Sequence, residues 1–218
     1  MLQAESRDGV TSGKEEVPQH WRAELGIPAR MFGAADGAYS VALCTPTGLP
    51  IVTNAGFSVV PGVATEELAT ADTVIVSPVD PTYLRRELSP EMRDALILVR
   101  PGARVVSICT GGFTLAAAGL LDSLVATTHW QCSPLFQKWY PHIGLDENVL
   151  FVDSGNVMTS AGAASGIDLC LHLIFKDHGT EMANRVARRC VVAPRVADLR
   201  ALMAAGRGDA ALGRVDVD

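Results

Sequence analysis

Short apolar runs alternate with amphipathic segments along most of this chain. Residues 73–76 and 104–108 are continuous runs rich in β-branched side chains, which is the pattern of strands buried on both faces. Residues 51–60 predict two short strands around a turn at 54–56. Four further short strands are expected at residues 39–44, 125–128, 149–152 and 157–159.

Helical patterns lie between these strands. Ser89 and Pro90 predict the start of a helix over residues 90–99, because serine caps a helix and proline suits its first position. The segment 161–178 is apolar nearly all round and predicts a buried helix that stops at Gly179. Strands that alternate with helices favour an α/β fold with a largely parallel sheet covered on both faces. The remaining helices are expected at residues 24–32, 113–121, 133–140 and 181–189.

The two ends of the chain differ from its middle. Residues 1–22 are rich in charge, with few aliphatic side chains and no regular period, so we expect a mobile N-terminal arm. Residues 23–195 are expected to form a single domain. Residues 196–218 are interpreted as a short tail that holds no helix-turn-helix.

Composition narrows the class of protein. With 218 residues, 48% hydrophobic and 19% charged, the chain is long enough for one core and too apolar for general disorder. It shows neither an 18-residue apolar run nor a secretory start, so we expect a cytoplasmic protein without a membrane partner. The net charge of −6 disfavours autonomous DNA binding. The five cysteines are far apart and form no CxxC pair, which disfavours a disulfide scaffold.

The sharpest chemical signal is RVVSICTGGF, residues 104–113. A buried strand runs directly into a helix through Cys109, whose neighbours are small, as a nucleophile elbow requires. The start of the helix favours the thiolate form of Cys109, so the residue is a candidate nucleophile. If its pocket is open to solvent, Cys109 should be the most reactive of the five thiols. A strand-to-helix junction that contains a buried structural cysteine remains the alternative.

Three segments together resemble a known family: SICTGGFTLAAAGLLDSLVATTHW, VMTSAGAASGIDLCLHLI and DHGTEMANRVARRCVVAPR. They resemble the ThiJ/PfpI domain of the class I glutamine amidotransferase-like superfamily. More narrowly, they look like the N-terminal domain of GlxA-type, AraC-family transcriptional regulators. The resemblance implies a flavodoxin-like three-layer α/β/α sandwich that carries a reactive cysteine and forms a homodimer.

The resemblance also suggests site residues by position. Cys109 matches the elbow cysteine, His129 of ATTHW matches its neighbouring histidine, and Glu24 of ELGIP matches the acidic residue that orients the thiol. An imidazole and a carboxyl group near a thiol can tune its pKa and move a proton. A structural histidine and a solvated carboxylate are the alternatives for His129 and Glu24. The predicted ligand-binding residues are Thr110, Gly111 and Val79.

The chain departs from the family pattern in three places. An apolar first strand should precede Glu24, yet a polar arm stands there, so the first strand is expected to be missing. The family often has Pro-Gly after the strand at 73–76, where this chain has Ser-Pro-Val-Asp, which puts an oxyanion-stabilising amide at Val79 in doubt. Only 23 residues follow Arg195, too few for the tandem DNA reader of the regulators.

These observations leave three hypotheses open. The first is a regulatory, ligand-sensing domain that binds an unknown small molecule and lacks the DNA-binding half. The second is a cysteine-dependent enzyme of the same superfamily, resembling an isonitrile hydratase, an amidase or a glyoxalase. The third is a non-functional remnant. No cofactor is expected, and no metal either, since the HxxC spacing of His129 and Cys132 has no second pair.

Overall fold

The main sheet holds four strands in the order β4-β5-β9-β8 in the computed structural model, which describes residues 20–21 and 23–192. β4 (Thr73–Val76), β5 (Arg104–Ile108) and β9 (Val157–Ser160) run parallel, and β8 (Phe151–Asp153) lies antiparallel to β9 at one edge. The mostly parallel sheet expected from the sequence is thereby confirmed.

Two smaller sheets accompany the main one. β1 (His20–Trp21) pairs parallel with β2 (Ile51–Thr53), and β2 pairs antiparallel with β3 (Ser58–Val59). β6 (Val125–Ala126) pairs with β7 (Gly144–Leu145), a strand that the sequence pattern did not indicate. Where the first strand was expected to be missing, the described residues contain a strand of only two residues, and it pairs with β2 alone.

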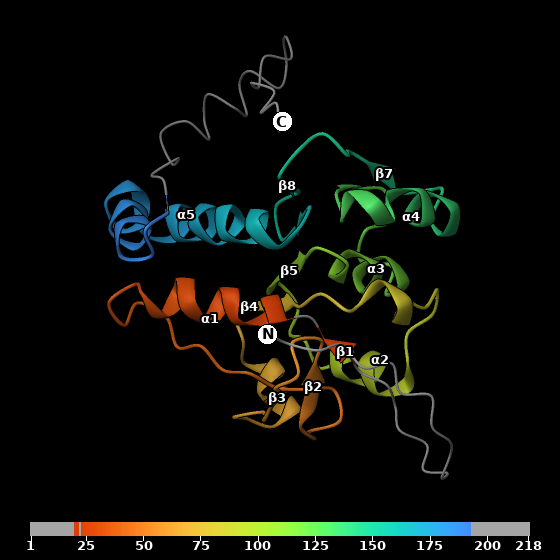
Figure 1. The fold of residues 1–218 in the computed structure, drawn as a ribbon, viewed down its shortest axis with the longest axis horizontal. Coiled ribbons are helices and arrows are strands. Elements are labelled where there is room, and N and C mark those ends of the chain that lie inside the picture. Colours follow the sequence, from red (N-terminus) through yellow and green to blue (C-terminus); the bar gives the residue numbers. More distant parts are fainter. Residues whose placement is uncertain (1–19, 22, 193–218) are drawn as a thin grey trace, which may run out of the picture.

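Helices cover both faces of the strands, in three layers. Figure 1 shows α1 and α5 on one side of the strands and α2, α3 and α4 on the other. This is the α/β/α arrangement that the resemblance implied. The α-helices are α1 (Gly26–Gly33), α2 (Pro90–Ile97), α3 (Gly111–Ala117), α4 (Ser133–Trp139) and α5 (Ala163–Arg189). The 3-10 helices are η1 (Ala23–Leu25), η2 (Thr65–Ala69), η3 (Pro81–Tyr83) and η4 (Trp130–Cys132).

Two predicted helix boundaries have the expected physical causes. The Ser89 hydroxyl accepts a hydrogen bond from the Met92 amide at 3.2 Å, so Ser89 caps α2. Within α5, Gly179 adopts a φ of 77°, which breaks the helix into the two segments expected from the sequence.

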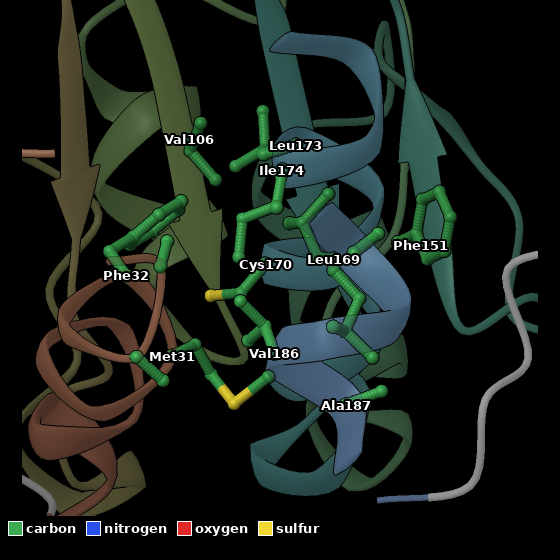
Figure 2. Close-up of a cluster of buried hydrophobic side chains, with 14 of the residues drawn as sticks. Met31, Phe32, Val106, Phe151, Leu169, Cys170, Leu173, Ile174, Val186 and Ala187 are labelled. Atoms are coloured by element: carbon green, nitrogen blue, oxygen red, sulfur yellow. The ribbon is translucent and has the colours of Figure 1, made fainter. Parts of the chain in front are cut away.

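The sheet separates two hydrophobic cores, and neighbouring residues of β5 point into different ones. Val106 packs with α1 and α5, whereas Val105 packs with α3 and α4. Figure 2 shows the first core, in which Met31 and Phe32 of α1 face Cys170 and neighbouring side chains of α5. The continuous apolar run of β5 is therefore explained by burial on both faces.

Three predicted elements differ in the structure. Residues 39–44 form no strand; the Leu43 carbonyl accepts from the Gly62 and Val63 amides instead of a ladder partner, and the Tyr39 hydroxyl donates to Asp177. The helix expected at 113–121 begins earlier and ends at Ala117, since Gly119 is left-handed at φ 73°. The strand expected at 125–128 is shorter because the Thr127 amide donates to a side-chain hydroxyl.

The predictions for the two ends of the chain concern residues that lie mostly outside the described part. The expected arm at residues 1–22 falls outside the described residues except for β1, and so does the tail at 196–218. Within the described part of the chain, no helix is long and apolar enough to cross a membrane.

Candidate functional site

Cys109 occupies a left-handed backbone conformation, with a φ of 57°, at the junction of β5 and α3. Left-handed geometry costs an L-residue roughly 1–2 kcal/mol, so a cysteine there needs support from its surroundings. A sharp strand-to-helix turn of this kind is the geometry of a nucleophile elbow.

Hydrogen bonds from neighbouring segments hold this turn. The Cys109 amide donates to the Ser160 carbonyl at 2.9 Å, at the end of β9. The Cys109 carbonyl accepts from the Thr128 hydroxyl at 3.1 Å and from the Gly112 amide at 3.3 Å. The strained residue is thus fixed by backbone and side-chain groups from three parts of the chain.

Thr110 ties the elbow to the loop after β4. Its hydroxyl donates to the Val79 carbonyl at 2.5 Å and accepts from the Val79 amide at 3.0 Å. Thr110 itself is fully buried. The Val79 amide, a candidate donor to an oxyanion, is therefore already used within the protein.

Two glycines follow, and they differ sharply in the space around them. A Cβ on Gly111 would lie 2.5 Å from the Val76 carbonyl oxygen, closer than any real contact, so β4 and α3 can approach only at a glycine. A Cβ on Gly112 would meet its nearest atom, the Thr127 carbonyl oxygen, at 3.5 Å, an ordinary contact. Gly111 thus serves the close approach of two elements.

His129 lies in the segment whose Thr128 hydroxyl supports the elbow at Cys109. It directly follows Thr128, whose hydroxyl bonds to Cys109, and it caps η4 by accepting the Gln131 amide at 3.3 Å through Nδ1. Its ring stacks on Trp130. This capping role is that of a structural histidine, and a role toward the thiol stays a prediction.

Glu24 lies in η1, directly before α1, and its side chain is partly buried. Its neighbour Leu25 lines a cavity together with Val76 and Ser77, the residues that approach Gly111. The structure therefore brings this part of the chain near the β4 end of the site. The predicted contact of Glu24 with the thiol stays a prediction.

Burial distinguishes the five cysteines. Cys109 is only 1% exposed, and Cys132 and Cys170 are buried too, whereas Cys44 and Cys190 are partly exposed. Burial raises the pKa of the Cys170 thiol to about 12, because an apolar setting disfavours the charged thiolate. High reactivity of Cys109 depended on a pocket open to solvent, and with the thiol 1% exposed it stays a prediction.

Sequence reasoning missed two residues that shape the elbow. Thr128 bonds to the Cys109 carbonyl through its hydroxyl and Ser160 to the Cys109 amide through its backbone carbonyl, contacts that residue type alone does not reveal. A sequence signal did exist, because Thr128 lies in ATTHW and Ser160 in TSAG, two segments on which the family resemblance rests. In the described residues, no group of three or more His, Cys, Asp or Glu side chains is arranged to hold a metal ion.

Comparison with known families and structures agrees with this geometry. The DJ-1/PfpI family matches residues 19–176. The crystal structure of a ThiJ/PfpI family protein from Pseudomonas syringae superposes with a TM-score of 0.68 at 21% identity, over 87% of this chain and 83% of that protein. That similarity establishes the fold.

Curated relatives include both regulators and an enzyme. The HTH-type transcriptional regulator GbdR of Pseudomonas aeruginosa is 31% identical over 133 residues, 61% of this chain and 35% of the regulator. Isonitrile hydratase of Pseudomonas putida is 37% identical over 91 residues, 41% of this chain and 38% of that enzyme. The chain thus spans about a third of the length of such a regulator.

Proposed function

The chain belongs to the DJ-1/PfpI family, and from that premise we propose that it is a regulatory, ligand-sensing domain related to those of AraC-family transcriptional regulators. Its ligand is an unidentified small molecule that binds beside Cys109. We include in this proposal a homodimer in the cytoplasm, with no cofactor and no membrane partner.

One observation favours ligand sensing over catalysis. Thr110 engages both the amide and the carbonyl of Val79. A cysteine enzyme that adds its thiol to a polarised bond needs donors aimed at the charge that develops, and one such donor contributes about 10²–10³ in rate. With the Val79 amide already paired, the elbow favours binding over turnover.

DNA recognition is not expected of this chain. Its net charge of −6 opposes binding to a polyanion, since that binding depends on positive side chains that displace counterions from phosphates. Four arginines lie near the C-terminal end of α5 and beyond it, but Asp36 pairs with Arg185 and Arg189. Of these four arginines, only Arg188 and Arg195 are left outside the pairing with Asp36, too few for a duplex-binding face.

Fluorescence anisotropy with a labelled DNA duplex tests this proposal. We expect no association tighter than micromolar between about 50 and 200 mM salt. Nanomolar binding that weakens steeply with salt would overturn it. The variant Asp36→Asn removes the negative charge that Arg185 and Arg189 share, so the same titration on this variant shows whether the assay responds to added net positive charge.

A second function, a cysteine-dependent enzyme, is favoured by the similarity to isonitrile hydratase. The shared elbow would place Cys109 as the nucleophile, with His129 and Glu24 as groups that move its proton. This alternative requires the thiol to become accessible, because Cys109 is 1% exposed. It predicts turnover that disappears in Cys109→Ala.

A further inference from the structure

α5 is built from two helical segments that meet at Gly179. The backbone there has φ 77° and ψ −177°, a combination that is essentially restricted to glycine. A Cβ at this position would meet no atom within 4 Å, so the backbone conformation, and not a close contact, requires the glycine. The space around Gly179 is open, as a hinge needs.

The first segment, residues 163–178, is anchored to the main sheet by polar contacts. His172 Nε2 lies 2.7 Å from the Asp153 carboxylate at the end of β8. Arg104 of β5 donates two hydrogen bonds to the Asp177 carboxylate, at 2.6 and 2.7 Å. Two different strands therefore hold this segment in place.

The second segment, residues 180–189, is anchored to α1 and the residues just after it. The Asp36 carboxylate pairs with Arg185 at 3.1 Å and also with Arg189. Arg189 further donates to the Ala34 carbonyl at 2.9 Å. Among the described residues, no hydrogen bond or ion pair joins this segment to a strand. The two halves of α5 thus have different partners.

Apolar burial differs between the two segments as well. In the second segment only one large side chain, Val186, is fully buried, and Figure 2 shows it beside Met31 of α1. Because the strength of packing follows the apolar area that is buried, the second segment is the more weakly held of the two. The fully buried residues of the first segment include Leu169, Cys170, Leu171, Leu173 and Ile174, and those of the second are Ala183, Val186 and Ala187.

We propose that residues 180–189 form a hinged helix that releases from α1 by rotation at Gly179, while residues 163–178 stay packed on the sheet. Burial of Val186 and the pairing with Asp36 favour the docked state. Relief of the glycine-only bend, which interrupts the helical backbone of α5, favours the released state. The use of this helix as the output of a sensing domain rests on the function proposed above, whereas the hinge itself does not.

Amide hydrogen exchange on the full chain, followed by NMR, measures the release. We expect the amides of residues 183–189 to exchange at least about tenfold faster than those of residues 166–174. We also expect residues 183–189 to share one protection factor, because a cooperative unit opens as a whole. Fraying of the helix end would instead give protection that falls steadily toward Arg189, and this result would overturn the proposal.

Two variants, Val186→Ala and Ile174→Val, each remove buried carbon from one segment. Val186→Ala weakens docking on α1 alone, so it should speed exchange of residues 183–189 about tenfold and leave residues 166–174 unchanged. Ile174→Val weakens the packing of the first segment, so it should speed exchange of residues 166–174 alone. Equal acceleration of both segments by either variant would show one cooperative helix and overturn the hinge.

Cys190 gives a second readout, since it ends α5, is partly exposed and packs against the same core. Gly179→Ala disfavours the docked bend, so alkylation of Cys190 by iodoacetamide should become at least about fivefold faster. Gly155→Ala is the matched control, because Gly155 has a φ of 87° and equally open surroundings but lies between β8 and β9, and it should leave the Cys190 rate unchanged. Equal Cys190 rates in the two variants would contradict a hinge at Gly179.

Discussion

Cys109 combines a left-handed backbone with a fully packed side chain, and these two features favour different replacement residues. The left-handed φ favours glycine or a short unbranched residue, whereas the packing favours a side chain of the same volume. The flanking glycines in the sequence suggested the turn, but the bonds that hold it come from residues 19 and 51 positions further along the chain.

Cys109→Val should separate the backbone effect from the loss of the thiol. A β-branched residue clashes in the left-handed region and adds a methyl group to a packed site, so we expect a loss of about 2–4 kcal/mol in unfolding free energy. Cys109→Ser should lose about 1 kcal/mol, since it keeps the shape. Urea denaturation of both variants measures the difference, and equal stability would show that the elbow is not strained.

Gly111 and Gly112 form a matched pair for a second test. Gly111→Ala places a Cβ 2.5 Å from a backbone oxygen of β4, so we expect a loss of about 3 kcal/mol or more. Gly112→Ala meets only ordinary contacts and gains up to about 1 kcal/mol of helix propensity. Thermal unfolding should rank Gly112→Ala at or above the wild type. A similar drop in melting temperature for both variants would argue against a close approach of β4 and α3 at Gly111.

At the scale of elements, a charged cluster links β5 to α5 at the far end from the elbow. Arg104 makes two hydrogen bonds to Asp177, at 2.6 and 2.7 Å, and the Tyr39 hydroxyl donates to the same carboxylate at 2.9 Å. Burial alone would raise the pKa of Asp177, but the hydrogen bonds from Arg104 and Tyr39 outweigh it and hold that pKa below its usual value.

This cluster predicts part of the acid sensitivity of the fold. Because the folded pKa of Asp177 is depressed, its contribution to stability is complete above the unfolded value of about 4 and is lost as the pH falls through the folded value. Asp177→Asn should be less stable than the wild type at pH 7 and should lose less between pH 5 and 3. Urea midpoints across that range measure it, and parallel curves for the two proteins would contradict the assignment.

The elements that were predicted correctly are those whose signal is local. β4, β5 and α2 have unbroken apolar runs or a capping serine, so sequence fixes them within one or two residues. The composition of residues 39–44 predicts a strand, yet the Tyr39 hydroxyl donates a hydrogen bond to Asp177, 138 positions along the chain, which no local pattern reveals. The Thr110 and Val79 pair, 31 residues apart, was equally beyond any local pattern.

At the scale of the molecule, the layered fold follows from the alternation of strands and helices, whereas the gap beside β4 does not. The sequence indicated only that a strand was missing. Among the described residues, β4 pairs with β5 alone, and an apolar cavity lies between β4 and β2. The similarity to regulators and to an enzyme leaves the chemistry at Cys109 as the decisive question.

Turnover measured on the wild type and on Cys109→Ala answers that question most directly. Each protein is incubated with an alkyl isonitrile, a simple amide or methylglyoxal, and product formation is followed by chromatography against a sample without protein. A sensing domain, with the Val79 amide paired and the thiol buried, should give no Cys109-dependent product from any of the three. Multiple turnovers of one substrate by the wild type, abolished in Cys109→Ala, would contradict the regulatory account and establish an enzyme.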